Sequence, residues 1–314
     1  MDFHKNFLKV FKDESSIEKP IFIVGPPRSG TTITYLIMCA HPDLAWFSTY
    51  DIKYWVPRTW VPTQKIITIG NTLLKKPINR ELQWMLNGPD EPGKNRSRLP
   101  SNLQPIEGNS FWNRIFKDWP KKDISNQAKL EIKKIISDTI KRQNKPRFLN
   151  KAPLHSTRLF VLKDIFPDAK FINLIRDPRA TIASSLKRHE QEGGFAVNSW
   201  PIINKSKYET LDLIQKYAWL YSEVVDASHE FLEINKGNNF MTIIYEDFMK
   251  NPIETLSKML NFCQLSIPKS LDDMIPPIQE TTHKWKERFS IEDQKKIFDI
   301  VQPSINKMHY PYKI

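Results

Sequence analysis

The chain has 314 residues, of which 40% are hydrophobic and 26% charged, a composition typical of a globular protein. Lysine and arginine outnumber aspartate and glutamate by 47 to 35, so the formal charge is +12 and an anionic partner is favoured. No apolar run reaches the roughly 18 residues that a transmembrane helix needs, and the first residues lack the apolar core of a signal peptide. We therefore expect a cytoplasmic protein without a transmembrane span.

Cysteine and histidine give no sign of a metal site or of a disulfide framework. The two cysteines, Cys39 and Cys263, lie in apolar runs and are expected to be small buried side chains. The seven histidines show no HExxH or similar ligand spacing, so we expect no metal. The basic residues are scattered, whereas a nucleic-acid-binding protein would show clustered basic stripes, so no nucleic-acid partner is expected.

Taken in chain order, the apolar patterns alternate between strands and helices. Strands are expected over residues 20–24, 147–150, 170–175 and 241–245. Helices are expected over residues 31–40, 125–144, 156–166, from about 178, 207–235 and 252–263. This alternation predicts a single α/β domain over residues 1–314, with a P-loop-like parallel β-sheet flanked by helices on both faces.

Residues 44–120 interrupt this alternation. They contain many prolines and six tryptophans mixed with basic residues, which favours a helical or irregular insertion that packs on the domain or forms a substrate pocket. Most of the tryptophans are expected to fill a core, although such rings also stack on sugar faces. Ligands of parallel sheets bind beyond the carboxyl ends of the strands. The loops after Val24, Asn150, Ile175 and Tyr245 are therefore expected to converge on one site.

The segment GPPRSGTT, from Gly25 to Thr32, follows the first expected strand and opens the first expected helix. Its spacing matches the phosphate-binding loop G-x4-G-K-[ST], in which backbone N–H groups and the helix dipole bind phosphate. Thr31 stands where that loop has the lysine that contacts the β and γ phosphates. Ser29 and Thr32 add hydroxyls, and Arg28 adds a charge. The frame favours phosphate binding over an ordinary strand–turn–helix connection, but for a donor without a triphosphate.

A second candidate phosphate site is NLIRDPRATIASSLKRHE, residues 173–190. Arg176 ends an expected strand, and Pro178 suits the first turn of the helix that follows. Ser184 and Arg188 are four residues apart and share a helical face, so with Arg176 they could surround a phosphate. A basic, solvent-exposed helix end explains these residues equally well.

A third candidate is RFLNKAPLHS, residues 147–156. Lys151 follows an expected strand directly and therefore lies at the mouth of the sheet. Its charge could stabilise negative charge that develops during group transfer. His155 lies nearby, but packing or capping explains it as well as chemistry does.

Together these segments resemble the sulfotransferases that use 3′-phosphoadenosine 5′-phosphosulfate (PAPS), and most closely the branch of the tyrosylprotein and many bacterial sulfotransferases. The motifs of that branch occur here as PRSGTT (27–32), AHPD (40–43), NKAP (150–153), FPDAKF (166–171), RDPRA (176–180), YED (245–247) and HKW (283–285). These matches extend over nearly the whole chain. Short motifs such as YE or KW would mean little alone.

The resemblance implies an enzyme that moves a sulfuryl group from PAPS to an acceptor hydroxyl or amine without a metal ion. It also accounts for the missing lysine, because the donor has no metal-bridged triphosphate. It assigns the 5′-phosphate to Arg28, Ser29, Gly30, Thr31 and Thr32, and the 3′-phosphate to Arg176, Ser184 and Arg188. By the same resemblance, Tyr245 and Lys284 bind the donor, while Lys151 and Arg28 support the transferring group.

The catalytic base is absent from the two positions where the family places it. The tyrosylprotein enzymes have a glutamate where this chain has Thr49, and the cytosolic small-molecule branch has a histidine where this chain has Pro153. Three other residues are available as substitutes: Glu107, Asp51 and His155. We favour Glu107, because bacterial relatives resemble a P-x-E-x(3–4)-W pattern in this segment. A surface carboxylate paired with Arg96 or Arg98 is the alternative explanation of Glu107.

The acceptor is less well specified than the donor. The aromatic and basic insertion suits a glycan, a lipid headgroup, a phenol or a peptide. We expect a carbohydrate, a glycolipid or a small hydroxylated metabolite, because family residues for a protein tyrosine are missing. Two other functions stay open: a non-catalytic nucleotide-binding relative, and a P-loop nucleotide kinase, which would need a lysine at position 31.

Overall fold

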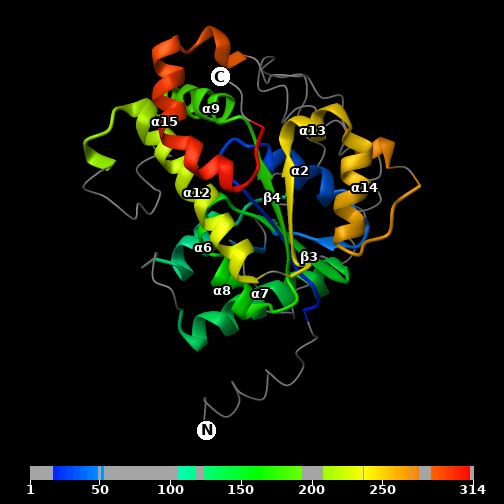
Figure 1. Cartoon of the computed structure of the whole chain (residues 1–314). Coiled ribbons are helices and arrows are strands. Elements are labelled where there is room, and N and C mark those ends of the chain that lie inside the picture. Colours follow the sequence, from blue (N-terminus) through cyan, green and yellow to red (C-terminus); the bar gives the residue numbers. More distant parts are fainter. Residues whose placement is uncertain are drawn as a thin grey trace.

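The computed structural model describes residues 17–48, 51–52, 105–117, 124–192, 208–235, 237–269, 271–275 and 284–311 of the chain. Its sheet has the strand order β2-β3-β1-β4-β5, and all neighbouring strands are parallel (Figure 1). The strands are β1 (Ile21–Val24), β2 (Leu44–Ala45), β3 (Arg147–Lys151), β4 (Lys170–Ile175) and β5 (Phe240–Ile244). The predicted parallel α/β sheet is thereby confirmed.

Helices connect these strands and follow the last of them. In chain order they are α2 (Thr31–Cys39), α6 (Asn109–Ile115), α7 (Asn126–Gln143), α8 (Leu159–Ile165), α9 (Pro178–Glu192), α12 (Leu213–Asn235), α13 (Tyr245–Lys250), α14 (Pro252–Phe262) and α15 (Ile291–Lys307). Short 3-10 helices are η3 (Pro153–Thr157), η4 (Asp272–Met274) and η5 (Lys284–Glu287). The last helix, α15, packs along α12 (Figure 1).

The sheet is covered on both faces. In β1, Ile21 and Ile23 enter a core shared with α2, α13 and α14, whereas Phe22 and Val24 enter a second core shared with α6, α7 and α8. A third apolar cluster joins α9, α12 and α15. Figure 1 shows α12 and α14 on opposite sides of β4. Strands buried on both faces are continuous apolar runs, which makes them recognisable in the sequence.

The central strand β1 has β3 on one side and β4 on the other. Its loop therefore lies at a switch point, where open α/β sheets bind ligands beyond the carboxyl ends of the strands. The register pairs Ile23 with Lys151 on β3 and with Ile172 on β4. Because β3 ends at this register and β4 ends shortly after it, the loops that follow the three strands start side by side.

Some boundaries differ from those expected. The helix expected over residues 156–166 is divided into η3 and α8, and Tyr245 begins α13 instead of ending a strand. The expected insertion at 44–120 contains β2 and α6, although residues 53–104 lie outside the described part of the chain. No helix in the described ranges is long and apolar enough to cross a membrane.

Candidate active site

The loop between β1 and α2 is built to approach an anion. Gly25 and Gly30 have φ values of +138° and +94°, and a Cβ on either would lie 2.3 Å from its nearest neighbour, Leu174 O or the Tyr245 ring. The N-terminus of α2 has neither a side-chain cap nor an acidic residue in its first turn. Its first N–H groups and the positive end of its dipole are therefore available to a ligand. The buried Ser29 hydroxyl has no hydrogen-bond partner among the described residues, which also favours a ligand here.

The second predicted phosphate segment lies against this loop. Arg28 Nε donates to Ser184 Oγ at 3.0 Å, and Arg176 Nη1 donates to the Arg28 carbonyl at 3.3 Å. Arg176 is buried, and within the described residues its Nε has no acceptor. Leaving a buried guanidinium N–H unpaired is costly, so an anion bound here would remove that cost. Arg188 is exposed and lies one helical turn beyond Ser184 on α9.

Tyr245 connects the two segments. The Arg176 guanidinium lies over its ring, with 4.4 Å between Arg176 Cζ and the ring centroid. Another part of the same ring lies against the Cα of Gly30. Burial raises the pKa of Tyr245 while Arg176 opposes the rise, so the phenol is neutral near pH 7. A single neutral ring thus sets the spacing between the glycine loop and Arg176.

Lys151, the last residue of β3, brings a buried charge to the glycine loop. Its side chain is 4% exposed, donates from Nζ to Thr32 Oγ1 at 3.0 Å, and forms an ion pair with Glu107. Burial lowers the pKa of Lys151, the Glu107 carboxylate opposes this, and the charges of Arg28 and Arg188 lower it further. The cations predicted from three separate segments therefore lie close enough to influence one another.

Glu107 reaches this cluster from the insertion. An isolated antiparallel bridge pairs Ser48 with Pro105, and Ile106 N–H donates to the Phe47 carbonyl at 2.8 Å, which fixes the chain just before Glu107. One carboxylate oxygen pairs with Lys151, and the other accepts from Asn109 Nδ2 at 3.0 Å. Beside it lies a pocket of about 280 Å³ lined by Thr32, Tyr35, Leu36, Pro105, Ile106, Glu107, Gly108, Asn109 and Ser110. Glu107 thus lines this pocket and also pairs with Lys151.

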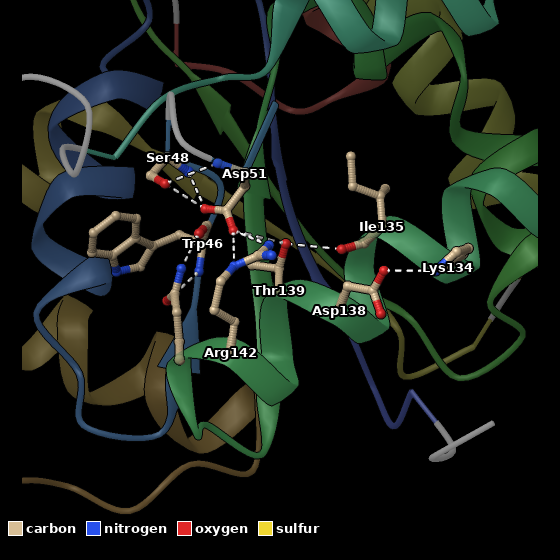
Figure 2. A network of polar contacts seen from close by, with 9 residues as sticks. Trp46, Ser48, Asp51, Lys134, Ile135, Asp138, Thr139 and Arg142 are labelled. Carbon is tan, nitrogen blue, oxygen red and sulfur yellow. Dashed lines mark hydrogen bonds and ion pairs between the residues drawn. The ribbon is translucent and has the colours of Figure 1, made fainter. Parts of the chain in front are cut away.

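Asp51, the second candidate base, is occupied by structural contacts (Figure 2). It forms an ion pair with Arg142, whose Nε lies 2.8 Å from Asp51 Oδ1. The Ser48 N–H donates to the other carboxylate oxygen at 2.8 Å, and the Ser48 hydroxyl also donates to that oxygen. The Thr139 hydroxyl lies 3.4 Å from Oδ1 but donates to the Ile135 carbonyl at 2.8 Å. Only 2% of the side chain is exposed. An acceptor substrate could not approach this carboxylate, which instead joins the start of the insertion to α7.

His155, the third candidate, is buried among aromatic rings. The Trp112 indole N–H can only donate, and it lies 3.0 Å from Asn150 Oδ1, so this atom is an oxygen as assigned. His155 Nε2 lies 2.9 Å from the same oxygen and must therefore carry a proton. Burial lowers the pKa of His155 well below its usual value, so the ring is neutral. Its free lone pair, on Nδ1, is buried, which argues against proton transfer with a substrate.

Several predicted positions cannot be compared with the structure. Thr49, Arg96 and Arg98 lie outside the described residues. Lys284 lies within η5, but only its backbone is described. The described residues contain no group of three or more histidine, cysteine, aspartate or glutamate side chains that could hold a metal ion.

This chain matches the sequence profile of the sulfotransferase family over residues 20–269, well over half of its length. The chain belongs to the sulfotransferase family. It is an enzyme of the class that the three motifs predict, with PAPS as co-substrate. The nucleotide-kinase alternative is thereby set aside.

This sulfotransferase has relatives of two kinds. It is 23% identical over 303 residues to protein-tyrosine sulfotransferase A of Caenorhabditis elegans, covering 92% of this chain and 67% of that protein. It is 25% identical over 268 residues to omega-hydroxy-beta-dihydromenaquinone-9 sulfotransferase Stf3 of Mycobacterium tuberculosis (strain CDC 1551 / Oshkosh), covering 77% of this chain and 62% of that protein. The chain thus matches about two thirds of the length of each.

A solved structure shows the shared fold. The crystal structure of sulfotransferase STF9 from Mycobacterium avium matches with a TM-score of 0.60 at 16% identity, covering 99% of this chain and 81% of that one. At this identity the match extends to the fold and not to the acceptor. This match in fold agrees with the parallel sheet described above.

The prediction of a cytoplasmic location is wrong. The animal relatives of this sulfotransferase, from Caenorhabditis elegans, Danio rerio and Drosophila melanogaster, are protein-tyrosine sulfotransferases, which are Golgi-resident. The prediction rested on the lack of a signal-peptide pattern, and a missing pattern carries little physical information about location.

Sequence reasoning passed over two residues that the structure brings to this site. The Ser156 hydroxyl accepts from the Gly25 N–H at 2.8 Å and donates to the Gly25 carbonyl at 3.2 Å. Glu246 accepts from the Asp177 N–H at 3.0 Å. Both lie within or beside the motifs already recognised. Their partners are main-chain groups, however, and a side chain that binds backbone leaves no spacing pattern in the sequence.

Proposed function

We propose that this sulfotransferase moves the sulfuryl group of PAPS to a hydroxyl or amine held in the pocket beside Glu107, with Glu107 as the base. The observation that carries the proposal is the double contact of Lys151. Its ammonium group binds Thr32 on the glycine loop and Glu107 on the pocket wall. One cation therefore joins the donor half of the site to the acceptor half.

Donor binding is assigned to the two anion-binding segments. The glycine loop, Arg28 to Thr32, would hold the 5′-phosphosulfate, and Arg176, Ser184 and Arg188 would hold the 3′-phosphate. The buried Ser29 hydroxyl and Arg176 Nε support this, because each would gain a partner from a bound phosphate. In this proposal Tyr245 and Lys284 complete the donor site.

The transfer forms one S–O bond and breaks another. The acceptor oxygen attacks sulfur in line with the leaving phosphate, and Glu107 takes the acceptor's proton. The leaving group, adenosine 3′,5′-bisphosphate (PAP), keeps the electron pair of the broken bond. Arg28, Lys151 and the N–H groups at the start of α2 would stabilise the charge that develops there. General base catalysis of this kind is typically worth about 10²–10⁴-fold.

For the acceptor we propose a hydroxyl on a carbohydrate, a glycolipid or a small metabolite. The pocket combines apolar side chains, such as Leu36 and Ile106, with the polar Asn109 and Ser110, which suits a compact group with both characters. The relatives suggest other classes of acceptor, because one is named for protein tyrosine and another for a hydroxylated menaquinone. A tyrosine side chain is therefore the acceptor to test against.

The first experiment measures the donor. Calorimetric titration with PAP, beside ATP with magnesium, should give tight, metal-independent binding of PAP and little binding of ATP. Preference for ATP with magnesium would refute the donor assignment. Acceptor panels with labelled PAPS then follow, in which label transfer only to tyrosine peptides would refute the proposed acceptor class.

The second experiment tests the base. Glu107→Gln should keep PAP affinity and reduce transfer by about 10²–10⁴-fold. Glu131→Gln is the matched control, because it neutralises an exposed carboxylate that pairs with Arg114 on the surface. Unchanged transfer by Glu107→Gln would exclude Glu107 as base. PAP binding without transfer to any acceptor in the wild-type protein would favour a non-catalytic relative.

A further inference from the structure

The turn that carries Arg176 is held through its main chain by the C-terminal third of the protein. The Tyr221 hydroxyl, on α12, donates to the Arg176 carbonyl at 2.8 Å. The Asp177 N–H donates to Glu246 Oε1, on α13, at 3.0 Å. Both bonds are made by the one peptide group between Arg176 and Asp177, so they fix its plane from opposite edges, and with it the direction in which the Arg176 side chain leaves the backbone.

Glu246 is an unexpected residue for this place, because a carboxylate next to an anion-binding site repels the anion. Burial raises the pKa of Glu246, and the Asp177 N–H and the nearby Tyr310 hydroxyl oppose the rise. The second carboxylate oxygen, Oε2, is buried and has no hydrogen-bond partner among the described residues. Tyr310 follows α15, so the end of the last helix reaches the same turn. Burial also raises the pKa of Tyr310, and the neighbouring Glu246, Asp177 and Tyr221 raise it further. The Tyr310 hydroxyl therefore keeps its proton near pH 7.

The Asp177 side chain binds Arg179 and, among the described residues, makes no contact that would account for a carboxylate at position 246. It accepts three hydrogen bonds from Arg179: from the main-chain N–H at 2.8 Å, from Nε at 3.1 Å and from Nη2 at 2.8 Å. The Arg179 guanidinium in turn lies 3.9 Å from the centroid of the Trp285 ring. Glu246 therefore acts on the main chain of the turn, through the bond that it accepts from the Asp177 N–H.

We propose that Glu246 is a positioning residue for the 3′-phosphate of the donor. By accepting the Asp177 N–H, it fixes the turn so that the buried Arg176 guanidinium faces the phosphate. The inference rests on the proposed function, because the 3′-phosphate belongs to the donor assigned there. It predicts a result opposite in sign to simple electrostatics: removing this negative charge weakens the binding of an anion.

The test compares two ligands that differ by one phosphate, PAP and adenosine 5′-monophosphate. The ratio of their dissociation constants reports the contribution of the 3′-phosphate alone. Glu246→Ala should lower the wild-type preference for PAP by at least about tenfold, because it leaves a main-chain N–H unpaired and releases the turn. Glu246→Gln should retain the preference, because its side-chain oxygen can still accept from Asp177. Tyr221→Phe should lower the ratio in the same direction by a smaller factor, because it removes the bond at the other edge of the same peptide group.

Asp247→Ala is the matched control, because it removes the same charge from the neighbouring, exposed position of α13. It should leave the ratio unchanged or slightly raised. Equal losses of affinity for both ligands in Glu246→Ala would indicate general destabilisation and overturn the inference, as would an unchanged ratio. Should Glu246→Ala fail to fold, an unchanged ratio in Tyr221→Phe would overturn it instead. A wild-type protein without preference for PAP would refute the donor assignment itself.

Discussion

The ion pair between Asp51 and Arg142 gives the sharpest prediction about stability (Figure 2). Replacing Arg142 by alanine leaves the Asp51 carboxylate in place, 2% exposed, with its charge uncompensated. Removing one partner of a buried ion pair costs about 3–5 kcal/mol. Here Asp51 keeps two other donors, namely the N–H and the hydroxyl of Ser48. We therefore expect a loss near the lower end of that range, about 3 kcal/mol.

Urea unfolding at pH 7 measures this loss directly, from the change in midpoint at constant slope. Arg114→Ala is the control, because Arg114 pairs with Glu131 in solvent, where their side chains are 59% and 39% exposed. Exposed pairs contribute about 0–1 kcal/mol, so this variant should remain close to wild type. PAP affinity should not change in either variant. A loss for Arg142→Ala as small as that for Arg114→Ala would refute the structural role assigned to Asp51.

Further predictions concern the donor loop, a buried histidine and Lys151. Gly30→Ala should weaken PAP binding by more than about tenfold in calorimetry, because the αL backbone costs roughly 1–2 kcal/mol and the Tyr245 ring must move. His155 has its pKa lowered in the folded state, so below pH 6.5 the unfolded chain binds the extra proton and stability falls as pH decreases. His155→Gln should flatten this pH dependence, and equal slopes in both proteins between pH 6.5 and 5 would contradict the assignment. Lys151→Met should abolish transfer while the protein stays folded, as judged by circular dichroism.

The sequence indicated the segments of the proposed donor site because their signals are local. The glycines of the loop are required by its own backbone, and Ser184 and Arg188 share a face of one helix. Four strands of the sheet could also be predicted from the sequence, since they are largely apolar on both faces. Helix α15 was not predicted, although Ser290 and Asp293 form a capping box at its start. Pro303 inside the helix interrupts the usual pattern.

The acceptor side depends on contacts between distant segments, which a single sequence does not encode visibly. Asp51 and Glu107 are both carboxylates of the same irregular segment, and composition cannot separate them. Their difference comes from partners far along the chain: Arg142 on α7 encloses Asp51, whereas Lys151 on β3 draws Glu107 to the glycine loop. Favouring Glu107 rested on resemblance, and its place opposite Lys151 now gives that choice a physical reason.

The missing lysine of the glycine loop also finds its explanation in the sheet. In P-loop enzymes the cation at this point comes from the loop itself, where this chain has Thr31. Here the register of β1 and β3 sets Lys151 opposite Ile23, and its ammonium group reaches Thr32 from the neighbouring strand. A cation that enters from the side approaches the loop and also contacts the pocket wall at Glu107. That placement suits the transfer of one group between two half-sites better than the clamping of a triphosphate chain. Lys151 thus brings to the loop, from a neighbouring strand, a positive charge that Thr31 does not supply.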